Sequence, residues 1–386
     1  MSGVFATAGA GDVRVWCLET CQELLRIVVP NFTCSSVLFS GDGKSIVTGW
    51  NDGNIRAFTP LTGRLIYCIY NTHNKGTSAL DMTKDGKTLI SGGCEGQVRV
   101  WDIQPGCQSL KKVLKEHKSP VSAIQVSPND KEAVSAGTDG SAIIWDLVSL
   151  SRRQVMYANT LFMCICFEPL GCQLLTGGTD RSVAYWETGS GNLARELEAS
   201  KVGAINALDI TRDGQLFVTG GNDQMVKLWM YQEGIYTHLG LGHAGAVTCT
   251  RFSPDKQWIV SSCAAGSIIV WKMPEHFRKS SAPQPSKTAA TKASPKASLE
   301  EQLKLPLGDK PVQKSGGDRP HVPSVNRGKV EKIEAMDTSR SSVHSCCPCE
   351  ATAKNDNFKK STKVKCCKPP GNEKGFKIKF VFEKKI

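Results

Sequence analysis

One unit recurs along the first 271 residues of the chain and constrains its fold more than any other feature. Each copy is a turn of small residues followed by a short apolar strand that ends in an aromatic residue, as in GGCEGQVRVW and AGTDGSAIIW. Successive aromatic positions lie 42, 43, 44, 41, 43 and 42 residues apart. These aromatic residues are Trp16, Phe58, Trp101, Trp145, Trp186, Trp229 and Trp271.

A period of this length is typical of one four-stranded blade of a β-propeller, which takes about 40–45 residues. Turn pairs such as Asp42-Gly43 and Asp85-Gly86 separate the apolar runs. Asp-Gly favours tight hairpins because glycine accepts a positive φ. One blade cannot bury both faces of its sheet, whereas blades stacked around an axis cover each other. The repeat therefore predicts an all-β propeller.

The number of blades and their completeness follow from where the strands fall. We expect the chain to start at the third strand of a blade, with one strand from Val4 to Trp16 and an outer strand near Leu24 to Val28. The last unit ends at Trp271 without an outer strand. Either the N-terminal outer strand closes a six-bladed ring, or a seven-bladed ring lacks two strands and stays open. Seven strand-ending aromatic residues favour the seven-bladed type with an incomplete first blade.

Within the units, certain polar residues recur at fixed places, and in this the sequence resembles WD40 repeats. In that family a His, a Ser or Thr, an Asp and the Trp form a buried hydrogen-bonded chain. Here His117, Ser135, Asp139 and Trp145 match all four positions. We therefore expect these four residues to form a structural tetrad.

The other units keep only part of this set. One carries glutamate in place of aspartate, one has alanine in place of the acid, two lack the histidine, and one ends in phenylalanine. In that order they are His73-Ser91-Glu95-Trp101, His243-Ser261-Ala265-Trp271, Thr176-Asp180-Trp186, Thr219-Asp223-Trp229 and Thr48-Asp52-Phe58.

A recurring His, Ser and Asp also has the composition of a catalytic triad. A nucleophilic triad needs a solvent-open serine and an oxyanion site, whereas a trio repeated beside a Trp donor is typical of a satisfied core network. The sequence contains no GxSxG, P-loop or HExxH motif. It predicts a non-enzymatic protein without catalytic residues, cofactor or small-molecule substrate.

Charge divides the chain after Met273. Residues 1–273 contain 24 Lys+Arg and 24 Asp+Glu, whereas residues 274–386 contain 24 and 12, so the whole net charge of +12 lies in the second part. That part is rich in Ser, Ala, Pro and Lys, a composition unable to bury a core. We predict a propeller over 1–273 and a mostly disordered basic tail over 274–386. Such a tail can bind acidic surfaces through counterion release; nucleic acid is the less favoured target, and a solvated tether is the alternative.

The 16 cysteines are scattered, many of them in strand-like runs, which indicates a reducing compartment. No signal peptide and no run long enough for a membrane helix are evident, so we expect a cytoplasmic protein. A thiolate zinc site is one interpretation of a cysteine group in the tail. Its spacing lacks two CxxC pairs, so lipidation or simple reactive thiols are equal alternatives, and we assign no metal. The group is Cys346, Cys347, Cys349, Cys366 and Cys367.

Two further features concern contacts. The C-terminal GFKIKFVFEKKI alternates apolar and basic residues, a period of two that suits a strand added to an exposed sheet edge. Trp50, in the turn TGWNDG, is a candidate exposed aromatic anchor for a partner, with packing against a neighbouring loop as the alternative. Arg152 and Arg153, near an outer strand, are candidate partner contacts or simply solvated charges.

Several strings are more specific than the period, among them DGKSIVTGWNDGNIRAF, ANTLFMCICFEP, GTDRSVAYWE and VTGGNDQMVKLW. From about Val4 to Trp271 they resemble the family of cilia- and flagella-associated protein 52. That family has two tandem propellers, and this chain resembles the second, while the basic tail has no counterpart. The resemblance implies a structural scaffold inside the doublet microtubules of the axoneme, bound to tubulin and neighbouring axonemal proteins. The alternative is a soluble cytoplasmic WD-repeat adaptor that assembles a multiprotein complex.

Overall fold

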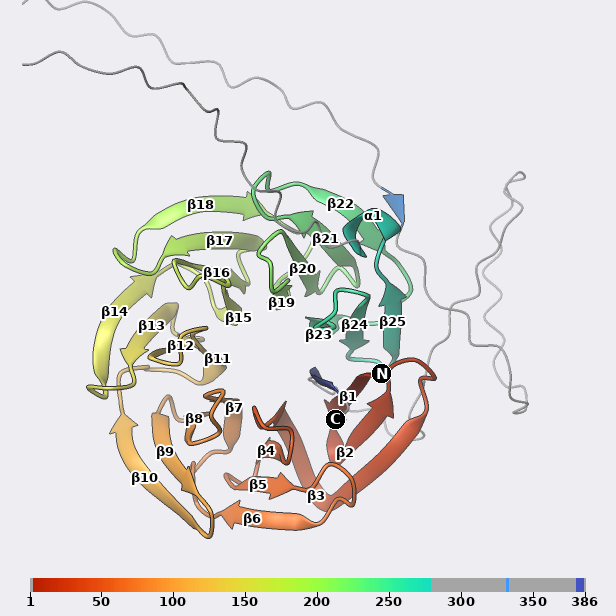
Figure 1. Cartoon of the computed structure of the whole chain (residues 1–386). Helices are drawn as coiled ribbons and strands as arrows, with labels where there is room; N and C mark the ends of the chain where they lie inside the picture. Colours follow the sequence, from red (N-terminus) through yellow and green to blue (C-terminus); the bar gives the residue numbers. More distant parts are fainter. Residues whose placement is uncertain (1–2, 279–330, 333–379, 385–386) are drawn as a thin grey trace, which may run out of the picture. The chain divides into compact units, whose positions relative to one another are not determined.

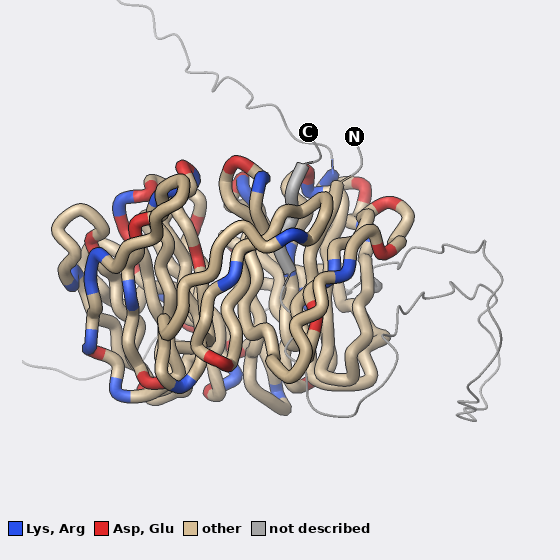
Figure 2. The backbone as a smooth tube through the Cα atoms, turned by 90° about the horizontal axis from the view of Figure 1, so that it is seen from below, with Lys and Arg blue, Asp and Glu red and all other residues tan. Residues whose placement is uncertain are grey.

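The computed structural model describes residues 3–278, 331–332 and 380–384, and its strands follow one another around a central axis (Figure 1). All of these residues belong to one of two compact units in the chain, Met1–Arg278 with Val330–Ile386. Charged residues of both signs are mixed on the loops at the two rims of this unit (Figure 2). No helix in the described part of the chain is long and apolar enough to cross a membrane.

The strands form six hydrogen-bonded sheets, five of which are small. Three of these are four-stranded: β7 (Thr77–Met82), β8 (Thr88–Gly93), β9 (Val98–Gln104) and β10 (Cys107–Leu114); β11 (Val121–Val126), β12 (Glu132–Gly137), β13 (Ser141–Asp146) and β14 (Ser151–Tyr157); β15 (Phe162–Phe167), β16 (Gln173–Gly178), β17 (Ser182–Glu187) and β18 (Leu193–Glu198). A fourth has five strands: β19 (Ile205–Ile210), β20 (Leu216–Gly221), β21 (Val226–Met230), β22 (Tyr236–Gly240) and β26 (Glu331–Lys332). The fifth has three: β23 (Val247–Phe252), β24 (Trp258–Cys263) and β25 (Ile268–Lys272).

The sixth sheet has seven strands because one long strand serves two neighbours. Its order is β27 (Phe380–Lys384), β1 (Gly3–Ala8), β2 (Ala10–Cys17), β3 (Glu23–Phe39), β4 (Ile46–Trp50), β5 (Ile55–Phe58) and β6 (Leu65–Ile69). The first part of the 17-residue β3 pairs with β2, and its second part pairs with β4. The all-β propeller is as predicted, whereas a count of seven blades is not confirmed, since the strands form six sheets.

The beginning of the chain differs from the prediction. Instead of one strand from Val4 to Trp16, β1 and β2 form a hairpin, in which Gly9 N donates to Asp12 O at 3.1 Å. The prediction that the chain starts at the third strand of a blade is therefore wrong, because a further strand precedes the strand of Trp16. On its other side β1 pairs antiparallel with β27, from Gly3–Lys384 to Thr7–Phe380. The C-terminal strand thus occupies the inner edge of β1. The sequence predicted that this segment could add to an exposed sheet edge but did not identify which edge.

The region after Met273 is described only in part. α1 (Glu275–Arg278) follows β25 directly, and its Phe277 packs against a buried cluster of β20, β21 and β25. The predicted disorder of residues 274–386, and all five tail cysteines, fall largely or wholly outside the described residues.

Some turns of the propeller bring two backbone segments into close contact. Gly53 has a φ of +79°, and a Cβ atom there would lie 1.8 Å from the carbonyl oxygen of His73, in the connection between β6 and β7. Only glycine fits such a contact. Between sheets, aromatic side chains fill the core, as where the rings of Phe217 and Trp229 stack with centroids 5.5 Å apart.

Ending the chain after Asn372 is expected to lower its melting temperature by roughly 5–10 °C, because five residue pairs with β1 are lost and the β1 edge is exposed. Calorimetry of the full-length and shortened chains measures this. A chain lacking residues 341–357 but keeping the C-terminal strand is the control and is expected to melt like the full chain. Equal melting of the shortened and full-length chains would show that β27 contributes nothing to the ring.

Candidate functional site

The predicted tetrad residues lie together in one buried network. Trp145 Nε1 donates to Ser135 Oγ at 2.8 Å, and Ser135 Oγ lies 2.7 Å from His117 Nε2. At the other nitrogen of the imidazole, His117 Nδ1 lies 2.8 Å from Ser141 Oγ and 3.4 Å from Asp139 Oδ1. Ser141, which sequence reasoning missed, bridges the two by donating to Asp139 at 2.6 Å.

This network cannot act as a nucleophilic triad. Ser135 is fully buried, and its oxygen already accepts the indole hydrogen bond while its hydroxyl serves the imidazole. Burial lowers the pKa of His117, with Asp139 opposing the shift, so the imidazole is neutral near pH 7. A hydroxyl that is fully buried and already hydrogen-bonded to the indole and the imidazole holds strands in register and presents no attacking oxygen to a substrate.

The same indole-to-hydroxyl bond recurs around the ring. His73 extends one of these bonds into a full network, with Ser91 Oγ at 2.8 Å from Nε2 and Glu95 Oε1 at 2.6 Å from Nδ1. The bond in the first unit ends on Thr7, a partner absent from the sequence analysis because the strand that carries it was not recognised. The remaining bonds are Trp16–Thr7 (2.9 Å), Trp101–Ser91 (2.9 Å), Trp186–Thr176 (2.9 Å), Trp229–Thr219 (2.9 Å) and Trp271–Ser261 (2.7 Å).

Trp50 is not the exposed anchor that its turn suggested. Its side chain is 0% exposed, and its Nε1 donates to Thr48 Oγ1 at 2.8 Å. Phe58 occupies the usual tryptophan position in this unit but has no N–H, so Trp50 satisfies the buried hydroxyl instead. The ion pair between Asp52 and Arg56 (2.6 Å) places the guanidinium 5.5 Å from the Trp50 ring. The prediction was wrong because the donor role of position 58 passed to position 50.

In the last unit a thiol lies where the other networks have a carboxylate. Cys263 Sγ lies 2.9 Å from Ser267 Oγ, and His243 Nδ1 lies 3.3 Å from the same oxygen. Burial opposes ionisation of the Cys263 thiol, but hydrogen bonds from His243 and Ser267 outweigh it and lower its pKa to about 6. The thiol of Cys263 thus hydrogen-bonds with the imidazole of His243, an interaction that the methyl group of Ala265 cannot make.

A backbone comparison explains this exchange. In the two complete networks the residue two places after the serine is glycine. A Cβ at Gly93 would lie 2.2 Å from His73 Nδ1, and a Cβ at Gly137 would lie 2.5 Å from Asp139 Oδ1. The last unit carries Cys263 at this place and lacks the acid, so the side chain fills the space that the carboxylate leaves.

Both arginines singled out from the sequence lie on β14 at the outer rim. Arg152 Nη1 pairs with Glu116 Oε2 at 2.6 Å, with its side chain 53% exposed. Arg153 pairs with Glu132 and donates to the carbonyl oxygen of Thr188 at 3.1 Å. Each guanidinium therefore already has partners in its own or the next sheet, while part of it faces solvent.

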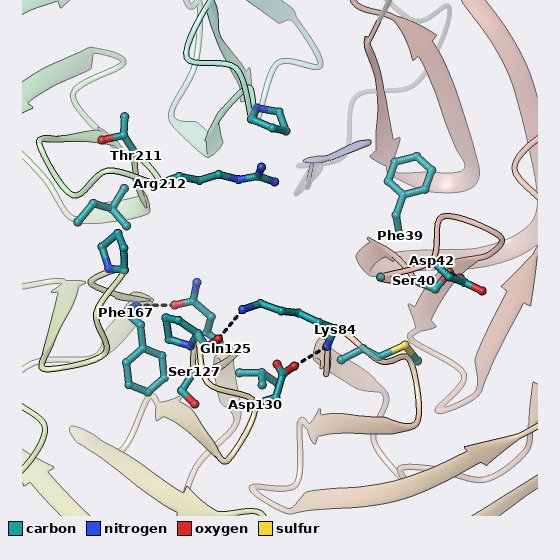
Figure 3. A pocket seen from close by; sticks show the side chains of 17 residues that line it. Phe39, Ser40, Asp42, Lys84, Gln125, Ser127, Asp130, Phe167, Thr211 and Arg212 are labelled. Carbon is teal, nitrogen blue, oxygen red and sulfur yellow. Dashed lines mark hydrogen bonds between the residues drawn. The ribbon is translucent and has the colours of Figure 1, made fainter. Parts of the chain in front are cut away.

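A candidate binding surface is a cavity of about 930 Å³ at one mouth of the axis, which we call the axial mouth (Figure 3). Turns that follow the inner strands line it, and Pro128, Pro169 and Pro254 each stand two residues after such a strand. Lys84 bonds across to the carbonyl oxygen of Pro128. Arg212 extends into the cavity in Figure 3, with no hydrogen bond or ion pair to any residue in the described part of the chain. Sequence reasoning missed this surface, although the recurring proline was visible.

Deeper along the axis, polar side chains of the inner strands join one sheet to the next. Burial raises the pKa of Asp81 to about 6, against the backbone hydrogen bonds that its carboxylate accepts. Burial likewise raises the pKa of Asp209, against the charge of Arg251. Each of three side chains accepts a hydrogen bond from a backbone N–H of the following inner strand. They are Asp81 from Val126 (2.6 Å), Gln125 from Phe167 (2.5 Å) and Asp209 from Phe252 (2.7 Å).

Comparison with known proteins places these observations in a family. Five segments match the WD domain, G-beta repeat family: 64–102, 108–146, 154–187, 191–230 and 235–272. The chain belongs to the WD-repeat family. The indole-to-hydroxyl bonds described above are thus those of WD repeats, and the units before residue 64 have the same bond although the family match begins later.

Among WD-repeat proteins, this one is similar to cilia- and flagella-associated protein 52. It is 55% identical over 271 residues to that of Homo sapiens and 46% identical over 270 residues to that of Chlamydomonas reinhardtii. Each match covers 70% of this chain but 44% of the relative, so the chain spans less than half the length of these proteins. A more distant similarity, 27% over 230 residues, 57% of this chain and 35% of the other, is to transcription factor unc-37 of Caenorhabditis elegans.

Replacing Cys263 by glycine is expected to lower the melting temperature by roughly 2–8 °C, because the buried imidazole of His243 loses the thiol and keeps only the 3.3 Å contact with Ser267 Oγ at Nδ1. Adding Ala265→Asp to Cys263→Gly recreates the arrangement of the complete networks and is expected to recover most of the loss. Thermal melts of the two variants compare them on the same glycine background. A double variant no more stable than the single one contradicts the role given to the thiol.

The raised pKa of Asp81 predicts a pH effect on stability. The folded chain binds this proton near pH 6 and the unfolded chain near 3.8, so folding is favoured as pH falls through this window and weakened as it rises. Asp81→Asn keeps an oxygen for Val126 N but loses the one that accepts from Met82 N. It is therefore expected to add only on the order of 1 kcal/mol at pH 7.5, with no gain at pH 4. Denaturant melts at both pH values measure this. Asp42→Asn, at a turn whose hydrogen bonds lower the carboxyl pKa, is the control and is expected to bring no gain at pH 7.5.

Proposed function

We propose that this chain is a non-enzymatic, protein-binding scaffold of motile cilia and flagella, placed in the cytoskeleton of the axoneme as a microtubule inner protein of the doublets. The observation that carries the proposal is the high identity to proteins named cilia- and flagella-associated protein 52, which runs through the whole ring rather than one repeat. Tubulin and neighbouring axonemal proteins are the proposed partners. Because the chain spans less than half of those relatives, its sharing of their role is itself part of the proposal.

The chemistry of the ring supports a scaffold over an enzyme. The His–Ser–acid groups that resemble a triad keep their serine hydroxyls buried and saturated at Ser91 and Ser135. Their repetition from sheet to sheet fits a role in folding, since an enzyme needs one site rather than several.

The proposed ring has seven blades. The seven-stranded sheet is then two blades joined through β3: β27, β1, β2 and the first part of β3 form one, and the second part of β3 with β4–β6 forms the next. Two indole-to-hydroxyl bonds in this sheet, Trp16–Thr7 and Trp50–Thr48, support the division, since the other units have one each. The proposed division of the chain is a propeller over 1–273, which β27 completes, and a basic tail over the rest of 274–386 that binds acidic surfaces.

The axial mouth is the proposed docking surface within this function. Its wall combines apolar groups such as Phe39, Met82 and the three prolines with the unpaired guanidinium of Arg212. Arg212 is exposed in the ring itself. A partner loop that carries a carboxylate among apolar residues fits this combination, because docking would cover the guanidinium and shield the ion pair from water.

The competing proposal is a soluble cytoplasmic adaptor, which the WD fold also supports. Localisation of the tagged chain in ciliated cells, followed by salt extraction of isolated axonemes, separates the two. Retention in the axoneme through high salt is the result expected for a doublet protein. A diffuse cytoplasmic signal with a partner set free of axonemal proteins would overturn the proposal in favour of the adaptor.

Arg212→Glu is expected to reduce the axoneme-bound fraction about fivefold or more, because it places an acid where the partner's acid docks. Its melting temperature is expected to be unchanged, since Arg212 has no partner in the described ring to lose. Arg64→Glu, the same charge change at an exposed turn of the outer rim, is the matched control and is expected to keep full retention. Equal retention of both variants would remove the axial mouth from the proposal.

A further inference from the structure

The outer edge of β25 pairs with no strand among the residues that the structure describes. In the other sheets the strand that ends in an aromatic residue carries an outer neighbour: β3 on β2, β6 on β5, β10 on β9, β14 on β13, β18 on β17 and β22 on β21. β25 pairs with β24 on one side, and no strand in the described ranges pairs with its other side. The two strands described after residue 278, β26 and β27, pair with β22 and β1 instead.

The hydrogen-bonding groups on this edge can be assigned. Met273 N donates to Gln257 O at 2.9 Å, and Cys263 N donates to Ser267 O at 3.1 Å. Because bonded sides alternate along an antiparallel strand, the N–H and C=O groups of Ile268, Val270 and Lys272 point away from β24. They offer a further strand a row of donors and acceptors.

The filled outer positions show what such a strand must contain. The residue three places before the strand-ending aromatic faces an apolar partner in five of the six cases. These pairs are Val13–Ile27, Ile55–Ile69, Val98–Leu114, Ala142–Met156 and Val183–Leu197. In β25 the same place belongs to Ile268, three residues before Trp271, so the added strand needs an apolar side chain there.

Charge adds a second requirement. Asp102, the residue after Trp101, pairs with Lys111 of the outer strand β10 at 2.7 Å, and Lys111 lies at the irregularity opposite that tryptophan. The residue after Trp271 is Lys272, which is exposed and has no ion pair within residues 3–278. In the last sheet the basic residue therefore lies on the strand that ends in the aromatic residue, and an acidic residue on the added strand would pair with Lys272.

α1, the segment described directly after β25, does not pair with this edge. Phe277 of α1 packs into the cluster shared with β20 and β21, and its ring lies 5.9 Å from that of His238 on β22. Figure 1 accordingly shows α1 beside β22. α1 is thus held on the side of the preceding sheet.

We propose that the outer edge of β25 binds an extended segment of another polypeptide as an added antiparallel strand, with an acidic residue facing Lys272 and, three residues later, Ile, Leu or Met facing Ile268. The three-residue spacing is that of Lys111 and Leu114 in β10. A second copy of β25 fits poorly, because antiparallel pairing centred on Val270 sets Lys272 against Ile268, where an apolar side chain is needed. The partner is therefore a different chain, and this surface is separate from the axial mouth.

A labelled peptide with the sequence of residues 107–114, with Cys107→Ser, tests this on the full-length chain, in two versions that differ by Lys111→Glu. Fluorescence anisotropy is expected to show the Glu version binding roughly two- to fivefold more tightly, the range of an exposed ion pair. On a Lys272→Glu chain the order is expected to reverse. Hydrogen exchange is expected to slow at the amides of Ile268, Val270 and Lys272 when the peptide is bound.

Two results would overturn the proposal. The first is that neither peptide binds at millimolar concentration, although the melting curves show that both chains are folded. The other is binding that leaves the β25 amides unprotected or protects those of β1, since the peptide would then be displacing β27. An unchanged order of the two peptides on the Lys272→Glu chain removes the acidic residue from the proposed pattern.

Discussion

The hydrogen bond from a buried indole to a hydroxyl on the neighbouring strand recurs through the ring, and the rest of the structure is arranged around it. An unpaired hydroxyl in this interior would cost free energy, so each Ser or Thr needs a donor. Trp145 also pairs with Ala133 of the strand that carries Ser135, two residues away. The bond thereby fixes the register of two strands, and a register fixed in each unit lets one unit stack on the next.

The units satisfy this requirement in different ways, and the differences follow from local chemistry. Where histidine is present, an acid or its substitute holds the far side of the imidazole: Asp139, Glu95 or the thiol of Cys263. Where phenylalanine replaces the usual tryptophan, Trp50 supplies the donor from the same strand as the hydroxyl. In each of these units the buried hydroxyl or imidazole has a hydrogen-bond partner, although the residue that supplies it differs from unit to unit.

Closure of the ring poses a different problem, since it depends on strands from distant parts of the chain. β27 joins β1 across more than 370 residues of sequence, and the entropy of closing so long a loop grows only slowly with length. In the sheet of β25, no strand from the described ranges pairs with the outer edge of that strand. The two edges thus have different occupants: one is filled by the chain itself, and the other is available to a partner.

The sequence by itself determined the features that depend on local periodicity. The spacing of the strand-ending aromatics gave the propeller, the alternating runs gave most strands, and the fixed places of His117, Ser135, Asp139 and Trp145 located one complete network. The end of the repeat at Trp271 was also visible, and among the described residues no strand pairs with the outer edge of β25. Each of these is encoded within about 43 residues, so neighbouring side chains suffice to reveal it.

Tertiary structure alone decided which residues meet across units. Trp50 was a candidate exposed residue in its turn but is buried. Its indole donates to Thr48, which receives no hydrogen bond from Phe58, and only the tertiary structure shows this substitution. Cys263 gained its role from the space left by Ala265, and the axial mouth formed from turns of several sheets. The seat of β27 on β1 likewise joins the two ends of the chain. Sequence patterns report on neighbours along the chain, whereas burial and long-range pairing depend on how the blades close into a ring.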